Sequence, residues 1–208
     1  MIDLDILVAL VANIVSFFVA RFAPSYMKHL LPTIDQEDTR EDSKSDKQTK
    51  CIAIGRAGGS EQLRIITLKP GIATCGYNLG KGCPPPFTMP LKADEDIPPN
   101  CVVLRNEAFS VNYADCCIRW GLYESANKFV GWPIVPGFDV AGTIEKAGAD
   151  AGLKSGDRVF GCTLFGAYSS RVLIPEIQLK KIPAGLTIQQ AAALPAVSLT
   201  ALYALFLA

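Results

Sequence analysis

The stretch Pro136-Gly137-Phe138-Asp139-Val140-Ala141-Gly142 indicates the fold of this chain more clearly than any other. From Phe138 to Glu145, residues that would face one side of a strand alternate with residues that would face the other. Gly137 and Gly142 mark points where another backbone or a ligand must come close. The stretch therefore predicts a β-strand that is packed tightly along its length.

The sequence on either side of this strand has the pattern of strands and turns that is typical of an all-β domain. Short apolar runs are separated by Gly, Pro and Asn. We expect strands at residues 52–54, 63–68, 101–104, 158–160 and 167–174. Residues 72–100 contain so many glycines and prolines that we expect an irregular surface insertion there.

In the second half of the chain, helices are predicted at two places. Asn112 to Arg119 suits a short helix, with Asn112 as the N-cap and Asp115 three residues later. Residues 187–208 are rich in Ala and Leu and are broken by Pro195, which predicts two consecutive helices. The predicted fold is therefore mainly β with short helices.

The N-terminal residues 1–32 predict an apolar helix that anchors the chain in a membrane. Residues 6–20 are apolar except for Asn13 and Ser16. They would span about 22 Å as a helix, so we extend the membrane segment to residues 4–23 to approach the roughly 30 Å hydrocarbon core. Acidic residues precede this segment and basic residues follow it, which places the folded part in the cytosol. The alternative is a cytoplasmic protein whose first helix packs on another protein.

Residues 33–50 are mixed in charge and nearly devoid of apolar side chains, which is typical of a flexible linker. The whole chain has 20 basic and 20 acidic residues, so its charge does not favour a polyanionic partner. No Lys/Arg stripe with interleaved aromatic residues is present, and we therefore expect no nucleic-acid binding.

Motifs spread over residues 51–208 resemble those of a known family. They include Asn112-Tyr113-Ala114-Asp115, Arg119 to Tyr123, Pro136 to Gly142, Gly156 to Val159, Gly166-Ala167-Tyr168, Pro183, Ala191 to Pro195 and Leu199 to Ala201. In order and spacing the chain resembles the medium-chain dehydrogenase/reductase superfamily, in particular its zinc-free quinone oxidoreductase branch.

The resemblance implies a GroES-like β-barrel, alcohol dehydrogenase-type catalytic domain at residues 51–186. In complete members a Rossmann domain that binds NADPH follows this barrel. Residues 187–208 would then be junction helices that lead to a nucleotide-binding domain, and no G-x-G-x-x-G motif for such a domain occurs in the 208 residues. Homo-oligomers would form only in a full-length protein, because relatives dimerise largely through that second domain.

Two departures within the family bear on the chemistry. Zinc-dependent alcohol dehydrogenases place a cysteine ligand where Asn112 stands and a histidine ligand where Phe138 stands, and the only histidine of this chain is His29. The resemblance therefore implies no catalytic zinc. It implies hydride transfer from NADPH to a quinone or to the β-carbon of an α,β-unsaturated carbonyl.

The resemblance also assigns roles to four residues. Asn112 and Asp115 would bind the nicotinamide side of the cofactor, and Thr200 would lie at the cofactor edge. Tyr123 could offer its hydroxyl to the substrate, so Tyr123 and Asn112 are the candidate catalytic residues.

Neighbouring residues favour structural roles to different degrees. For Tyr123 and for Arg119, packing and function are equally plausible. Asp139 and Asp157 are expected to make hydrogen bonds in the barrel or in turns, and Cys116 and Cys117 are expected to be core thiols on a helix.

Two functions from different classes remain open on the sequence. The first is an NADPH-dependent quinone or enone reductase of which the 208 residues are the N-terminal part. The second is a catalytically inactive, membrane-tethered GroES-like binding or adaptor module. In either case the apolar residues near the C-terminus would lack their expected cover, and these are Leu199, Leu202, Leu205, Phe206 and Leu207.

The membrane anchor is testable on its own. A fluorescent reporter fused to residues 1–32 should stay with the membrane fraction after salt and carbonate washing, because about 20 apolar residues partition into the bilayer. Release of the reporter by either wash would contradict the anchor and favour a helix that packs on another protein.

Overall fold

The structure is a computed structural model that describes residues 48–76, 88–90 and 97–206. The predicted apolar helix at residues 1–32 and the linker up to residue 47 lie outside the described residues. Within the described ranges, no helix is both long enough and apolar enough to cross a membrane. The predicted membrane segment at residues 4–23 is likewise outside them.

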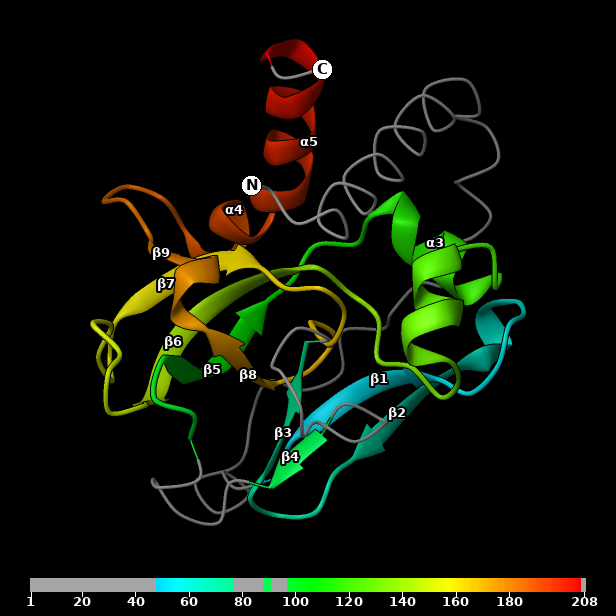
Figure 1. The fold of residues 1–208 in the computed structure, drawn as a ribbon, viewed down its shortest axis with the longest axis horizontal. Helices are drawn as coiled ribbons and strands as arrows, with labels where there is room; N and C mark the ends of the chain where they lie inside the picture. The colour runs from blue at the N-terminus through cyan, green and yellow to red at the C-terminus, as the bar shows by residue number, and fades with distance from the viewer. Residues whose placement is uncertain (1–47, 77–87, 91–96, 207–208) are drawn as a thin grey trace.

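The described part of the chain is mainly β, as predicted (Figure 1). The larger sheet has seven strands in the order β4-β3-β8-β5-β6-β7-β9, with β3 and β8 parallel and the other neighbours antiparallel. A separate antiparallel pair joins β1 to β2. The strands are β1 (Lys50–Ile54), β2 (Leu63–Thr67), β3 (Ile72–Cys75), β4 (Thr88–Pro90), β5 (Cys101–Ala108), β6 (Asp139–Ala147), β7 (Arg158–Cys162), β8 (Arg171–Pro175) and β9 (Leu179–Lys181).

The predicted strands β1, β2, β5, β6 and β7 are confirmed, and β8 begins four residues later than residue 167, where we expected it. The prediction of an irregular insertion at residues 72–100 is wrong. β3 and β4 lie within it, and Ala73 and Cys75 of β3 are fully buried. The sequence hides β3 because a strand of four residues that is buried between neighbours has no alternating pattern.

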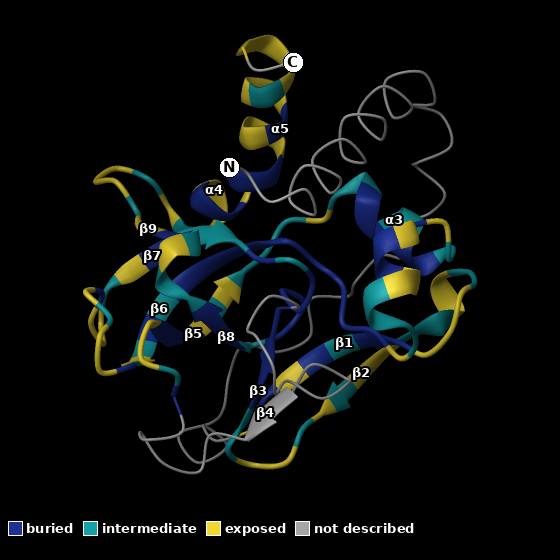
Figure 2. Ribbon diagram, viewed as in Figure 1, coloured by how far each residue is buried: buried dark blue, intermediate teal, exposed yellow. Residues whose placement is uncertain are grey.

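β6 is buried on both faces at its start (Figure 2). Val140 and Ile144 pack into the main apolar cluster of the sheet. On the opposite face, Ala141 packs against Ala191 and Ala192 of the short helix α4 (Ile188–Ala192). The strand therefore joins the barrel interior to the C-terminal helices.

Both glycines of the Pro136–Gly142 stretch are required by close approach, as predicted. A Cβ atom on Gly142 would lie 1.9 Å from the backbone oxygen of Arg105 on β5. Gly137 has φ of +98°, and a Cβ there would lie 2.4 Å from the ring of Tyr168. Any larger residue at these positions must displace backbone or a buried ring.

Four helical segments of five or more residues occur in the described ranges. They are α3 (Tyr113–Arg119), η3 (Ala126–Val130), α4 (Ile188–Ala192) and α5 (Pro195–Phe206), and the short 3-10 turns are η1 (Ser60–Gln62) and η4 (Glu176–Gln178). The two predicted C-terminal helices are confirmed. Pro195 begins α5, a position where a missing N–H costs nothing.

α5 projects from the sheet and leaves most of its apolar side chains exposed (Figures 1 and 2). It buries only Pro195, Ala196 and Thr200. Leu199 and Leu202 are about half exposed, at 49% and 50%, and Leu205 and Phe206 are each 75% exposed. The expected apolar surface is confirmed for these four residues, whereas Leu207 lies outside the described residues.

The contact at Gly142 leads to a stability prediction. Gly142→Ala should lower the free energy of unfolding by about 2 kcal/mol or more, because the added methyl group meets rigid backbone of β5. Urea denaturation measures this change. Gly55→Ala is the matched control, since a Cβ there meets nothing within 4 Å, and it should change stability by less than about 0.5 kcal/mol. Equal effects of the two substitutions would contradict the close approach of β5 and β6.

Candidate functional site

The candidate site begins where α3 starts beside β6. Asn112 precedes α3 in an extended conformation, and its backbone N–H donates to Asp115 Oδ2 at 2.9 Å. The predicted N-cap is therefore confirmed. The Asn112 side chain also reaches β6, because its Nδ2 donates to Ser110 Oγ at 3.0 Å and to Asp139 Oδ2 at 2.9 Å.

Asp115 is buried and accepts three hydrogen bonds. Besides the Asn112 N–H, these come from the Tyr168 hydroxyl to Oδ2 at 2.9 Å and from the Gly137 N–H to Oδ1 at 3.0 Å. Burial raises the pKa of Asp115 to about 7 and outweighs the three hydrogen bonds, which lower it, while the nearby Asp139 carboxylate raises it further. Asp115 thus joins α3 to the Pro136–Gly142 stretch.

Asp139 is the second buried carboxyl group of the site and is fully enclosed. Its Oδ2 accepts from the Ser110 hydroxyl and from the Asn112 amide, and its Oδ1 accepts from the Ala196 N–H at 2.8 Å. Burial raises the pKa of Asp139, and the three hydrogen bonds act in the opposite direction. The predicted hydrogen-bonding role is confirmed, and it reaches beyond the barrel to the first turn of α5.

Tyr123 lies inside an aromatic cluster that includes Phe138 and Phe165. Its ring centroid is 6.1 Å from that of Phe138 and 6.0 Å from that of Phe165, the latter edge to face. Among the described residues, no group meets its buried hydroxyl oxygen with hydrogen-bond geometry, although the Ser125 side chain lies close enough to lower its pKa slightly. Burial raises the pKa of Tyr123, and the Asp115 charge adds to this effect, so the hydroxyl keeps its proton.

Thr200 has the same unusual property on α5. The residue is only 8% exposed, and its Oγ1 finds no hydrogen-bond partner in the described part of the chain. Ala196, which donates to Asp139, lies four residues earlier on the same helix. Buried polar atoms in proteins are nearly always paired, so each of these two hydroxyls calls for a partner that the described residues do not supply.

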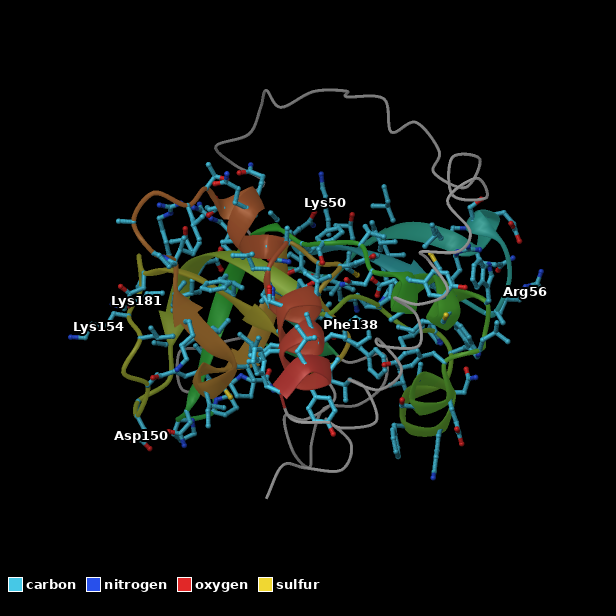
Figure 3. All side chains as sticks on the ribbon, turned by 90° about the horizontal axis from the view of Figure 1, so that it is seen from above. Lys50, Arg56, Phe138, Asp150, Lys154 and Lys181 are labelled. Carbon is cyan, nitrogen blue, oxygen red and sulfur yellow. The ribbon has the colours of Figure 1, made fainter. Side chains whose placement is uncertain are left out.

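The structure brings Asn112 and Asp115 into one hydrogen-bonded group. Tyr123 lies beside this group, because its ring packs on Phe138, which precedes Asp139 in the chain. Thr200 is linked to this group only through the backbone of α5 and its bond to Asp139. Figure 3 shows Phe138 in the middle of the molecule, far from peripheral side chains such as Lys154 and Arg56.

Sequence reasoning did not identify Ser110 and Tyr168 as parts of this group. Ser110 lies two residues before Asn112, and Tyr168 belongs to the motif Gly166-Ala167-Tyr168. Tyr168 also stacks on Phe109, with ring centroids 4.4 Å apart. Nothing local in the sequence reports that Tyr168 would reach Asp115, which is 53 residues away along the chain.

The neighbouring residues have structural contacts. Arg119 is buried, and its Nη1 donates to the Gly58 carbonyl at 2.7 Å, which favours packing over function. Asp157 closes a turn by accepting from the Lys154 N–H, as expected. Cys117 packs at the edge of the aromatic cluster, and burial raises the pKa of Cys116, which disfavours a reactive thiolate.

Asn112 and Phe138, which stand where zinc-dependent alcohol dehydrogenases have zinc ligands, are held by contacts within the chain. Phe138 is 2% exposed within the aromatic cluster, and the Asn112 amide is held by Ser110 and Asp139. In the described ranges, no three His, Cys, Asp or Glu residues gather in an arrangement suited to a metal ion.

Part of the sequence matches known proteins. Residues 98–184 match the model of the alcohol dehydrogenase GroES-like domain. The quinone oxidoreductase of Lama guanicoe is 34% identical over 125 residues, which is 58% of this chain and 37% of that protein. The human synaptic vesicle membrane protein VAT-1 homolog is 34% identical over 109 residues, which is 52% of this chain and 27% of that protein.

Solved structures extend the likeness to the fold. The quinone oxidoreductase of Pseudomonas syringae superposes with a TM-score of 0.58 at 31% identity, covering 76% of this chain and 41% of that one. Over part of its length the chain is thus similar to quinone oxidoreductases of the medium-chain dehydrogenase/reductase superfamily. The Escherichia coli quinone oxidoreductase, solved in complex with NADPH, has a TM-score of 0.58 at 27% identity, covering 76% of this chain and 40% of that one. The chain therefore spans well under half the length of these relatives.

The raised pKa of Asp115 predicts a pH dependence of stability. The folded protein holds this proton up to about pH 7, whereas an unfolded aspartate releases it near its ordinary value of 3.8. Its contribution to stability is therefore complete below about pH 4 and is lost as the pH rises through about 7. Between about pH 5 and about pH 8 the loss should be about 2 kcal/mol.

Urea denaturation at these two pH values measures the effect. Asp115→Asn should reduce the fall in stability between them. Asp157→Asn is the matched control, since the pKa of the half-buried Asp157 is lowered and its contribution does not change above about pH 5. An unchanged pH dependence in the Asp115→Asn protein would contradict a buried Asp115 that holds its proton.

Proposed function

We propose that the chain forms the catalytic barrel of an NADPH-dependent reductase that acts on quinones or α,β-unsaturated carbonyls without zinc. The observation that carries the proposal is the buried Tyr123 hydroxyl, which has no partner among the described residues and lies beside the Asn112, Asp115 and Asp139 group. Similarity to quinone oxidoreductases supports this reading, and one of these proteins was solved with NADPH bound.

The residues present fit the nicotinamide end of the cofactor. Both N–H bonds of the Asn112 side chain are engaged by Ser110 and Asp139, so the side chain can offer a ligand only its acceptor oxygen. A carboxamide NH₂ group, as carried by nicotinamide, is the complementary donor. Thr200, in the second turn of α5, adds a second hydroxyl that lacks a partner among the described residues.

Bound NADPH would supply the hydride. Tyr123 would donate a hydrogen bond to the carbonyl oxygen of the acceptor, where negative charge develops as the hydride arrives. Because its pKa is raised, the hydroxyl remains protonated at neutral pH and can act as the donor. Phe138 and Phe165 exclude water from this side of the hydroxyl, which strengthens the hydrogen bond.

In this arrangement no charge needs to be stabilised by a metal ion. The acceptor gains a hydride from NADPH and a proton from solvent, and Tyr123, which keeps its own proton, stabilises the developing negative charge on the oxygen by donating a hydrogen bond. An apolar, planar acceptor such as a quinone suits the aromatic surroundings of Tyr123 better than a small, hydrated alcohol does. The membrane segment at residues 4–23 would bring such an acceptor near the barrel, and this part of the proposal rests on the sequence alone.

The role of Tyr123 can be tested by removing one oxygen atom. In the protein expressed from its complete reading frame, Tyr123→Phe should lower kcat for NADPH-dependent quinone reduction about 100-fold, because the hydrogen-bond donor to the developing oxyanion is lost. The KM for NADPH should stay close to the wild-type value, since the cofactor contacts are made by other residues.

Tyr113→Phe is the matched control and should leave both constants close to those of the wild type. Tyr113 lies in the first turn of α3, where its ring packs edge to face with Trp120 at 5.9 Å. Wild-type kcat in the Tyr123→Phe protein would contradict the proposed role of the buried hydroxyl.

A further inference from the structure

The direction of the Asn112 side-chain amide is set by its surroundings. Its Nδ2 atom lies 2.9 Å from Asp139 Oδ2 and 3.0 Å from Ser110 Oγ. A carboxylate can only accept hydrogen bonds, so the end of the amide that faces Asp139 must be the NH₂ group. The carboxylate thereby determines that the oxygen, and not the NH₂ group, is directed away from Asp139, on the side of the α3 N-terminus, where it keeps a lone pair that a ligand can use.

The other oxygen of the same carboxylate holds α5. Oδ1 accepts from the Ala196 N–H at 2.8 Å. Pro195 has no N–H, so the amide of Ala196 is the first donor that this helix end presents. A negative charge at this position also complements the positive end of the helix dipole. One turn further along, α5 carries the buried Thr200 hydroxyl that has no partner in the described residues.

Asp139 is therefore a single buried group that joins two parts of the candidate site. The backbone of α3 does not depend on it, because the Asn112 N–H is held separately by Asp115. What depends on Asp139 is the orientation of the Asn112 amide and the seating of the first turn of α5. These two dependencies go through different oxygens, so they can be separated by substitution.

We propose that Asp139 is a positioning residue of the site: its carboxylate turns the Asn112 oxygen toward the nicotinamide carboxamide and fixes α5, with Thr200, against the barrel. This inference rests on the proposed function for the identity of the ligand. The orientation of the amide and the anchoring of α5 are properties of the chain itself.

Asp139→Asn separates the two dependencies because it keeps the size of the side chain. The new amide can still offer its oxygen to the Ala196 N–H, but its NH₂ group then faces Asn112. Two NH₂ groups repel each other, so the Asn112 amide must rotate and present its own NH₂ to the ligand. Asp139→Ala removes both interactions at once.

The double variant Asn112→Asp with Asp139→Asn supplies a rescue. The carboxylate at position 112 accepts from the NH₂ group at position 139 and still offers an acceptor oxygen to the ligand. Asp157→Asn is the control for the substitution itself, since Asp157 closes a surface turn and is bonded to Lys154 and Lys181.

The first measurement uses the 208-residue chain without cofactor. The NMR signals of the Asn112 side-chain NH₂ group should shift and lose protection in Asp139→Asn but not in Asp157→Asn. Hydrogen exchange in residues 195–206 should stay near wild type in Asp139→Asn and become faster in Asp139→Ala. Unchanged Asn112 signals in Asp139→Asn would overturn the proposal.

The second measurement uses the protein expressed from its complete reading frame. Asp139→Asn should raise the KM for NADPH about tenfold, the effect expected when one hydrogen bond to the ligand is lost, with a much smaller effect on kcat. The double variant should recover most of that change, a result that a merely structural role would not produce. A wild-type KM in Asp139→Asn, or no recovery in the double variant, would overturn the proposal.

The two arms distinguish failure of this proposal from failure of the proposed function. Absence of NADPH oxidation by the wild-type protein would contradict the proposed function. The Asn112 signals and the hydrogen exchange of α5 would in that case still decide whether Asp139 orients the amide and holds the helix.

Discussion

The burial of the Asp139 carboxylate is the constraint on which the site depends. An isolated charge in this position would be strongly unfavourable, and it is tolerated because donors surround both oxygens. Ser110, Asn112 and Ala196 supply these donors from the end of β5, the start of α3 and the first turn of α5. The cost of burying the charge is therefore offset only when all three segments come together, so the carboxylate couples the barrel to the C-terminal helices.

Asp115, on α3, is a second buried carboxyl group that draws several segments together. It gathers α3, the Pro136–Gly142 stretch and Tyr168 around one carboxyl group, and burial raises its pKa to about 7. Among the described residues, the hydroxyls of Tyr123 and Thr200 have no hydrogen-bond partner, unlike the polar groups around Asp115 and Asp139. In a region where nearly every other polar group is satisfied, these two atoms are the natural contacts for a ligand.

The parts of this arrangement that are local in sequence could be predicted from it. The Asn112 cap, the strand that begins at Asp139 and the helix that begins at Pro195 each follow from residues within a few positions of one another. The bond between Asp139 and Ala196 spans 57 residues, and no pattern in either segment announces it. β3 was missed for a related reason, since its burial is created by neighbours that are distant in the chain.

Similarity to quinone oxidoreductases indicates what related proteins do, and the described residues indicate how this chain could do it: Tyr123 as the hydrogen-bond donor to the acceptor, Asn112 as an oriented hydrogen-bond acceptor and Asp139 as the group that positions it. The most direct test is NADPH oxidation by the EDTA-treated protein, expressed from its complete reading frame, with a quinone as the acceptor. The account predicts loss of nicotinamide absorbance that depends on the quinone and needs no added metal. A folded protein that binds NADPH but oxidises it only after zinc is added would contradict the account.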